Sequence, residues 1–407
     1  MPRKKTGVAR NVTSKVVYFK SFGLLHSYFR TWADTSPEGY RFVYKDYFGR
    51  LVQGRSEKKL LENWAKPIMR AFTMPDKLLG SFATFFDAPF DGSSLTMTNG
   101  LLNFRHEPWM PVIFDAISSL IGHPYDLPFT HSLVENTLAR DDCKAIIYFF
   151  EATRRSLESA YDTSRFESKM EYVPLGIPLV PKKRRRNKNN VNIIFIGSVN
   201  YTQAGFNDVW FYNRGGHIVT KAFMHLRKEF DNITLTVRSQ LPLKYRLILE
   251  QDPRVTIIDH PISQQEFDDL LWAADIFLLP MRDTPWGSFL DAMNHELPVV
   301  TTHTYANAEI IRDGKWGVVC EMPSGYEAIV DNYYIPNRTA FGQIWNSWMT
   351  DERIVDEVVR GTGVLIKSVD LRNQLGQNGR KMIEPGGLFA VERRNAYLKR
   401  VLDKAID

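Results

Sequence analysis

Two carboxylates stand eight positions apart in the C-terminal half of the chain, where Asp283 and Asp291 belong to the segment PMRDTPWGSFLDAMNHELPVVT. The pattern predicts a strand that ends before Asp283 and a helix that begins near Ser288, with Asp291 in its first turn. Both carboxylates can accept hydrogen bonds from sugar or ribose hydroxyls. The amides of Gly287 and Ser288, at the helix N-terminus, suit phosphate or sugar oxygens. Taken alone, the two aspartates could equally serve to complement the helix dipole.

Two arginines are placed to supply positive charge to the same region. Arg214 precedes Gly215, where a helix is predicted to open, and Arg238 ends a predicted strand over residues 233–237. A cation at a helix start is unfavourable against the dipole, so Arg214 is better explained by a bound anion than as an ordinary surface residue.

The elements that must position these groups follow a repeating α/β pattern. Fully apolar strands alternate with helices, which is typical of a parallel sheet covered on both faces. The strands are predicted at residues 16–19, 110–115, 144–149, 191–196, 233–237, 255–258, 276–279 and 298–301. The pattern stops at a proline-rich exit and then restarts, which predicts two Rossmann-like domains facing each other across a cleft. In such sheets ligands bind beyond the carboxyl ends of the strands.

The predicted boundaries place an N-terminal acceptor-binding domain at residues 1–181 and a basic linker at 182–190. A nucleotide-sugar-binding domain follows at 191–385, and a C-terminal helix lies at 386–407.

The segment around the two aspartates resembles the E-x7-E region of retaining glycosyltransferases with the GT-B fold, in particular family 4 (glycosyl transferases group 1). The resemblance rests on Asp283, on Asp291-Ala292-Met293 and on Leu297-Pro298-Val299-Val300-Thr301, and it continues at Ala308-Glu309-Ile310-Ile311. Aspartates replace both glutamates of the family, and Pro285-Trp286 replaces part of its glycine loop. These departures leave the donor sugar open.

The resemblance extends upstream and assigns roles. Residues 191–197 resemble the first strand of the donor domain, and Asn213-Arg214-Gly215-Gly216 resembles a Lys-Gly-Gly turn, so Arg214 would hold the diphosphate. Ser198 stands where the family often has a second basic residue, and we expect Arg238 to supply that charge. The C-terminal stretch resembles the family's last helix, which crosses back onto the N-terminal domain.

The implied activity is retaining transfer of a sugar, of hexosyltransferase type and without a metal or other cofactor. The donor would be a UDP- or GDP-type sugar, and the acceptor a glycan, a lipid-linked or a small molecule. That chemistry belongs to polysaccharide or glycoconjugate biosynthesis. Asp283 would orient the sugar, and Asp291 would hold the ribose. The expected catalytic residues are Asp283, Arg214, Arg238 and His106, although a lone histidine is more often structural. The expected donor-binding residues are Gly197, Ser198, Gly215, His260, Trp286, Gly287, Ser288, Phe289 and Asp291.

Composition sets the remaining expectations. The chain has 407 residues, a net charge of +6 and two cysteines, which predicts a cytoplasmic protein with anionic partners. The run from Lys182 to Lys188 reads first as a solvated linker, and peripheral contact with the inner, anionic membrane face stays open; nucleic acid is not expected as a partner.

The sequence is compatible with three functions other than transfer. The alternatives are a nucleotide-sugar epimerase or a phosphorylase on the same fold, and a non-catalytic protein that binds polyanions or membranes through the basic linker. A dinucleotide-dependent oxidoreductase is disfavoured, because no predicted strand is followed by G-x-G-x-x-G.

Overall fold

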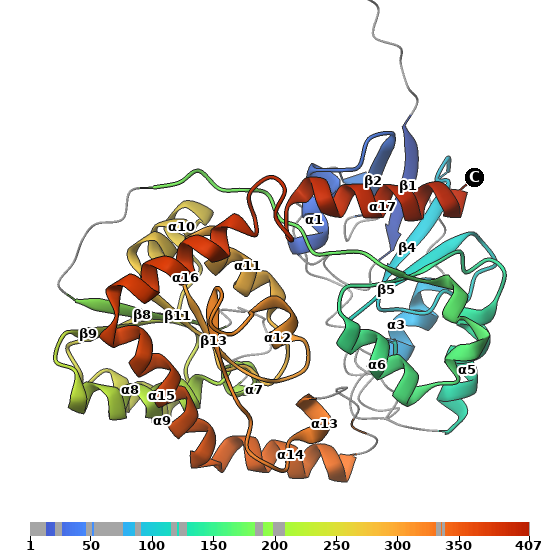
Figure 1. The fold of residues 1–407 in the computed structure, drawn as a ribbon. Coiled ribbons are helices and arrows are strands. Elements are labelled where there is room, and N and C mark those ends of the chain that lie inside the picture. The colour runs from blue at the N-terminus through green and yellow to red at the C-terminus, as the bar shows by residue number, and fades with distance from the viewer. Residues whose placement is uncertain are drawn as a thin grey trace, which may run out of the picture.

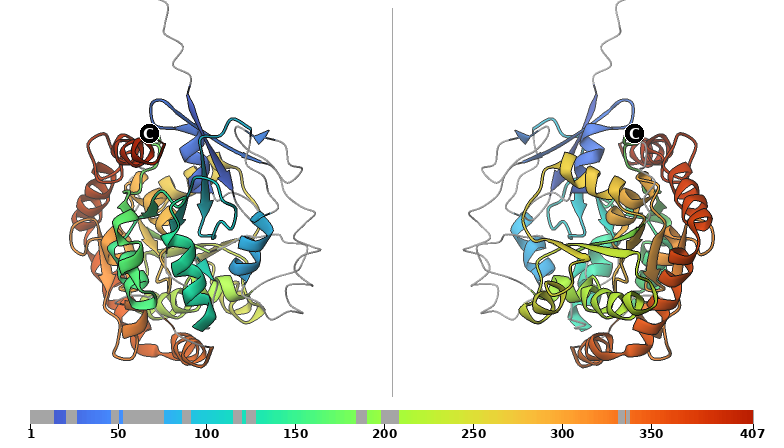
Figure 2. Two further views of the ribbon diagram at one scale, coloured as in Figure 1. Left: turned by 90° about the vertical axis from the view of Figure 1, so that its right-hand side faces the viewer. Right: turned by 90° about the vertical axis from the view of Figure 1, so that its left-hand side faces the viewer.

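The structure is a computed structural model, and it describes residues 14–20, 27–45, 51–52, 76–85, 91–114, 120–121, 128–183, 190–197, 208–330, 335 and 338–406. These residues form two β-sheets, each flanked by helices (Figures 1 and 2). The predicted α/β architecture of two Rossmann-like domains is confirmed.

The first sheet is formed by the N-terminal half and has the strand order β3-β2-β1-β4-β5-β6-β7. All its pairings are parallel except that of β2 with β3. Its strands are β1 (Lys15–Lys20), β2 (Tyr40–Lys45), β3 (Leu51–Val52), β4 (Leu95–Asn99), β5 (Trp109–Ile113), β6 (Ile146–Tyr148) and β7 (Met170–Tyr172). The helices of this half are α1 (Ser27–Asp34), α3 (Asp76–Phe85), α5 (Pro128–Ala139) and α6 (Glu151–Ala160), with 3-10 turns at Thr163–Arg165 and Glu167–Lys169.

The second sheet is entirely parallel and has the order β10-β9-β8-β11-β12-β13. Its strands are β8 (Val191–Ile196), β9 (Ile233–Arg238), β10 (Val255–Ile258), β11 (Ile276–Leu278), β12 (Val299–Thr302) and β13 (Gly317–Cys320). The helices are α7 (Asp208–Asn213), α8 (Gly216–Glu229), α9 (Leu243–Leu249), α10 (Gln264–Ala273), α11 (Trp286–Asn294), α12 (Asn307–Ile310), α13 (Glu327–Val330), α14 (Arg338–Thr350), α15 (Glu352–Lys367) and α16 (Val369–Lys381). The chain runs outward from β8 to β10 and returns to β11 on the other side of β8. This reversal opens a crevice at the carboxyl ends of β8 and β11.

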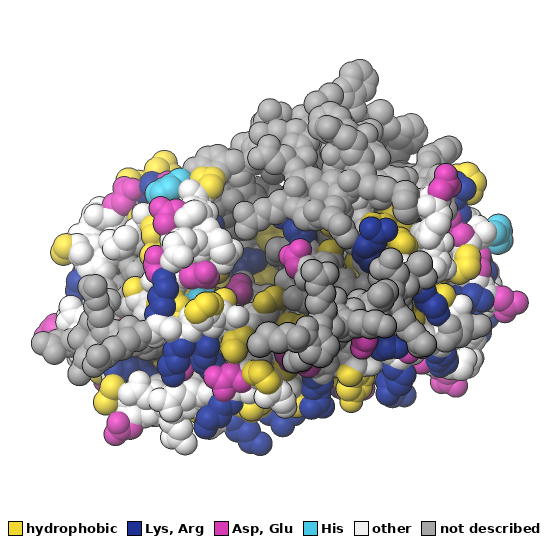
Figure 3. Space-filling view, turned by 90° about the horizontal axis from the view of Figure 1, so that it is seen from above, with side chains coloured by type: hydrophobic (Ala, Val, Ile, Leu, Met, Phe, Trp, Pro, Cys, Tyr) yellow, Lys and Arg dark blue, Asp and Glu magenta, His cyan; other side chains and the backbone are white. Residues whose placement is uncertain are grey.

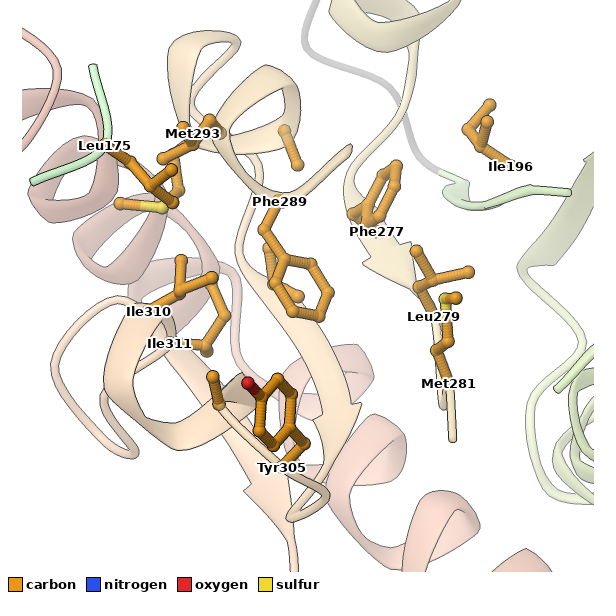
Figure 4. Close-up of a cluster of buried hydrophobic side chains, with 14 of the residues drawn as sticks. Leu175, Ile196, Phe277, Leu279, Met281, Phe289, Met293, Tyr305, Ile310 and Ile311 are labelled. Atoms are coloured by element: carbon orange, nitrogen blue, oxygen red, sulfur yellow. The ribbon is translucent and has the colours of Figure 1, made fainter. Parts of the chain in front are cut away.

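An apolar core fixes α11 against the second sheet. Phe289 is fully buried and points between Phe277 and Leu279 on one side and Ile310 and Ile311 on the other (Figure 4). Burial of a side chain of this size contributes about 2–3 kcal/mol. The loop before α11 is therefore anchored at the end from which the helix starts.

The last helix, α17 (Val391–Ile406), lies along the N-terminal domain beside β1 and β2 (Figure 1). Arg394 is fully buried there and donates hydrogen bonds to the carbonyls of Gly176 (3.1 Å) and Thr35 (2.8 Å). The Tyr40 hydroxyl donates to Asp403 on α17 at 2.7 Å. The predicted crossing of the C-terminal helix is confirmed, whereas the residue boundaries of the domains stay a prediction.

Candidate active site

Gly197, at the exit of β8, brings two strand ends unusually close. Its amide donates to the carbonyl of Arg238 at 2.9 Å. A Cβ atom at Gly197 would lie 2.1 Å from Oγ and 2.5 Å from Cβ of Ser239, so any other residue would force these strand ends apart. Glycine therefore allows the exits of β8 and β9 to meet, and this places Arg238 at the crevice.

Gly215 brings the start of α8 to the exit of β11. It adopts the left-handed backbone conformation, with φ of 74°, and a Cβ atom there would lie 1.9 Å from the carbonyl oxygen of Pro280. Both facts require glycine at this position. The turn places the preceding residue, Arg214, between the ends of β8 and β11.

Arg214 spans the crevice from one side to the other. Its Nη1 donates to the carbonyl of Ile196 and to Oγ of Ser288, both at 3.3 Å. Burial and, secondarily, the charge of Arg238 lower the pKa of this guanidinium to about 10, with Asp283 offsetting part of their effect. Its Nε is shielded from solvent and has no hydrogen-bond partner among the described residues.

Arg238 is the second cation of the crevice. Its guanidinium lies 5.5 Å from the centroid of the Phe267 ring, burial lowers its pKa, and its Nε is shielded and unpaired among the described residues. Within those residues neither Arg238 nor Arg214 forms an ion pair within 4 Å. Two mutually repelling, partly buried guanidiniums without a carboxylate partner make a site for an anion.

The helix α11 begins at Trp286, two residues earlier than predicted. Asp291 is its sixth residue and lies in the second turn, so the prediction of a first-turn position is wrong. The dipole explanation weakens accordingly, because that effect fades beyond the first turn. A Cβ atom at Gly287 would meet nothing within 4 Å, so there is open space beside this residue, and the first amides of the helix have no intrahelical acceptor.

The two aspartates differ in their surroundings. Asp283 is 30% exposed, lies in the loop before α11, and has its Oδ1 3.7 Å from Nε of Arg282. Burial and, secondarily, the charge of Asp268 raise the pKa of Asp291 to about 7. Asp291 therefore titrates near neutrality, and a hydrogen-bond donor such as a ribose hydroxyl would favour its charged form.

Sequence reasoning missed Arg282, which stiffens the loop that carries Asp283. Its buried guanidinium lies 5.0 Å from the ring centroid of Phe341 and 5.1 Å from that of Trp345, both on α14. No sequence pattern indicates this role, because the sequence does not show that α14 packs against the loop. The stacking holds Asp283 where it can affect Arg214.

Three predicted residues lie apart from the two arginines. Phe289 is a core residue and has no surface to offer a donor, so its assignment to donor binding is corrected. His260 is 63% exposed and lies beside Asp259. His106 is 87% exposed and pairs with Asp142 at 3.5 Å in the N-terminal domain, just before β5, at the amino edge of that sheet. Ser198 lies outside the described residues, and Trp286 faces the N-terminal domain.

Other classes of site find little support in the described residues. No group of three or more His, Cys, Asp and Glu residues there is arranged to hold a metal ion. None of the helices in the described part of the chain has the length and apolarity to cross a membrane. In the basic linker, Lys182 pairs with Glu296 and Lys183 with Asp269. On the face seen in Figure 3, the described Lys and Arg side chains are interspersed with acidic and hydrophobic ones.

Comparison with known proteins agrees with this geometry. Residues 190–333 match the family described as Glycosyl transferases group 1. The structure of Anabaena Alr3699/HepE in complex with UDP is similar, with a TM-score of 0.58 and 12% identity over 96% of this chain and 99% of that one. The structure of WaaG, a glycosyltransferase involved in lipopolysaccharide biosynthesis, is also similar. Its TM-score is 0.53, with 12% identity over 95% of this chain and 98% of that one. No curated protein matches the sequence.

A further match shows that relatives of this fold vary in length. A chain of the GtfA/B complex gives a TM-score of 0.51 at 12% identity over 77% of this chain, which spans only 57% of its length. The fold is that of the GT-B glycosyltransferases, and the predicted resemblance to group 1 is confirmed over residues 190–333.

Proposed function

We propose that the protein is a retaining glycosyltransferase that moves a hexosyl group from a nucleoside-diphosphate sugar to a glycan, lipid-linked or small-molecule acceptor. The observation that carries the proposal is the pair Arg214 and Arg238, which are partly buried and have no carboxylate partner among the described residues. A diphosphate between them would supply the missing negative charge.

The same geometry suits departure of a nucleoside diphosphate. Arg214 and Arg238 would stabilise the charge that builds on the leaving diphosphate, together with the amides at the start of α11. Asp291 would accept hydrogen bonds from the ribose, and Asp283 would orient the transferred sugar. The acceptor proton would pass to the departing phosphate on the face from which it leaves. No protein nucleophile and no metal is part of the proposed mechanism.

The first test is nucleotide binding. A ligand that binds only the folded state raises the melting temperature, so UDP, GDP and ADP can be compared by thermal shift. UDP is the first choice because HepE was solved with it. We expect the shift to vanish in Arg214→Ala and to persist in Arg360→Ala, whose side chain is 61% exposed and pairs with Glu357 on α15. If none of the three nucleotides shifts the wild-type protein, the proposal fails.

The second test separates transfer from the alternatives. A transferase releases nucleoside diphosphate in proportion to glycosylated acceptor, an epimerase releases none, and a phosphorylase requires inorganic phosphate. The anomeric configuration of the product, read by NMR, decides between retention and inversion. A steep salt dependence of polyanion binding, lost when residues 182–188 are neutralised, would instead favour the non-catalytic alternative.

A further inference from the structure

An aromatic side chain of the site loop contacts the other domain. Trp286, between Asp283 and Ser288, has its ring 4.3 Å from that of Tyr28, edge to face. The same ring is stacked on Phe114 at 5.6 Å and an interplanar angle of 5°. Tyr28 and Phe114 both belong to the N-terminal domain, so the loop is packed between the domains rather than within one.

Tyr305 makes a second contact from the next loop, which follows β12. It is buried and has a φ of 45°, a left-handed conformation that is unfavourable for a bulky residue. Its hydroxyl donates to the carbonyl of Phe114 and lies 2.8 Å from Oγ1 of Thr153 (side chain in Figure 4). Such a conformation persists only where its surroundings hold it, and here two groups of the N-terminal domain do so.

Glu309 makes a third contact, at the start of α6. Its two carboxylate oxygens accept the amide hydrogens of Glu151 and Ala152, both at 2.8 Å. The N-cap residue of α6, Phe150, offers no side-chain cap of its own. A carboxylate from one domain therefore caps a helix of the other.

These three residues, Trp286, Tyr305 and Glu309, form what we call the clasp. All three follow carboxyl ends of the second sheet, and their partners follow β1, β5 and β6 of the first. Phe114 receives two of them, the indole on its ring and the phenol on its carbonyl. The position of the loop that carries Asp283 is thus tied to the position of the whole N-terminal domain.

We infer that Trp286 and Tyr305 are positioning residues that hold the loop of residues 283–288, and with it Asp283, in register with the N-terminal domain. The inference rests on the proposed function and deepens it. Arg214 and Arg238 both belong to the C-terminal domain, so they can bind a nucleotide without the clasp. Transfer additionally needs donor and acceptor in register, and a misplacement of about 1 Å can cost about 10²-fold in rate.

Two substitutions separate positioning from ordinary packing. Tyr305→Phe keeps the ring and removes the hydroxyl that spans the domains. Tyr326→Phe is its matched control, because the Tyr326 hydroxyl lies 3.4 Å from Asp351 within one domain. Trp286→Ala removes the indole, and Trp286→Phe should restore part of the effect, since a phenyl ring can still stack on Phe114.

The experiment measures UDP affinity, kcat for transfer and the radius of gyration by small-angle scattering on these variants of the full chain. In the double variant Trp286→Ala, Tyr305→Phe we expect kcat to fall about 100-fold, UDP affinity to stay within about threefold, and the radius of gyration to rise. In Tyr326→Phe none of the three should change. An unchanged kcat with an unchanged radius of gyration in the double variant overturns the inference.

The two proposals fail in distinguishable ways. If the wild-type protein binds none of the nucleotides and transfers nothing, the proposed function falls, and the positioning role falls with it. Scattering still reports on the clasp in that case, because an increase in size needs no activity. If the wild-type protein transfers sugar and the double variant does so equally well, only the inference about the clasp is lost.

Discussion

Buried or partly buried cations lie at strand ends of both sheets, but only the cation of the first sheet pairs with a carboxylate among the described residues. At the end of β1, the fully buried Lys20 has its Nζ 2.9 Å from a carboxylate oxygen of Glu107. That carboxylate also accepts a hydrogen bond from Asn103 at 3.0 Å. At the ends of β8 and β9, Arg214 and Arg238 have no such carboxylate among the described residues. A buried charge that the chain itself neutralises is part of the fold, whereas one that it leaves unneutralised indicates a ligand.

The largest effect is expected from removing an arginine at the strand ends of the second sheet. Arg214→Ala should lower kcat for transfer by about 10²–10³-fold, as removal of a preorganised charge-stabilising group does. The melting temperature should not fall, because the substitution removes a repulsion with Arg238 that already lowers the pKa of Arg214. Steady-state kinetics measures the fall in kcat, and thermal unfolding measures the melting temperature. A folded variant with full activity would refute the assignment.

Removing the Lys20 cation from the first sheet should instead lower the free energy of unfolding. Lys20→Met leaves the Glu107 carboxylate, which is 13% exposed, with the Arg105 guanidinium at 3.5 Å as its remaining cation, and we expect a loss of about 3 kcal/mol of unfolding free energy. Urea unfolding measures the loss, and Lys399→Met, at an exposed pair with Asp403, is the control that should change little. The additional substitution Glu107→Gln should recover much of the loss. A Lys20→Met variant as stable as the wild type would show that Lys20 is not a structural cation, and the contrast with Arg214 and Arg238 would be lost.

A smaller effect is expected at Arg238. Its guanidinium is less enclosed than that of Arg214 and rests on the Phe267 ring. Arg238→Ala should weaken UDP binding about tenfold, roughly the value of one charged hydrogen bond. Arg238→Lys, which keeps the charge, should lose less. Calorimetric titration measures both, and equal affinities in all three proteins would restrict the anion site to Arg214.

The smallest effect concerns Asp291 and pH. Its folded pKa, about 7, lies above the ordinary value of 3.8, so the folded state binds the extra proton. Stability from this group is complete below pH 3.8 and is lost as the pH rises through about 7. Because the side chain is only partly buried, we expect a loss of about 1 kcal/mol between pH 4 and 8 in the free protein. Asp291→Asn should abolish that slope in unfolding curves; an identical slope would assign it elsewhere.

The sequence predicts the second domain better than the first for a physical reason. The strands β8 and β11 are apolar except for Asn192, and Gly197 follows β8 directly. By contrast, β4 reads Leu-Thr-Met-Thr-Asn, and its threonines at 96 and 98 are buried by neighbouring elements. Alternation of polar and apolar residues predicts a half-exposed strand, so the burial of β4 on both faces does not follow from its composition.

Residues at the site were predictable where local geometry decides their role. Gly197 is required by the close approach of the Ser239 side chain and Gly215 by that of the Pro280 carbonyl, and Arg214 follows from its place before a helix. Tyr305, Arg282 and the direction of Trp286 could not be found, because their partners come from other domains or from distant helices. Phe289 was misassigned because the pattern places it beside the loop but does not show which face of α11 is buried.

The crossing of α17 has a consequence for how the protein is made. Arg394 and its neighbours supply hydrogen bonds to residues of the N-terminal domain as early as Thr31. On the ribosome, the whole second sheet is synthesised between β7 and α17. At about 5–20 residues per second that interval lasts tens of seconds. During this interval the first sheet lacks α17, whereas the second sheet can already fold. The domain that is synthesised first is therefore completed last.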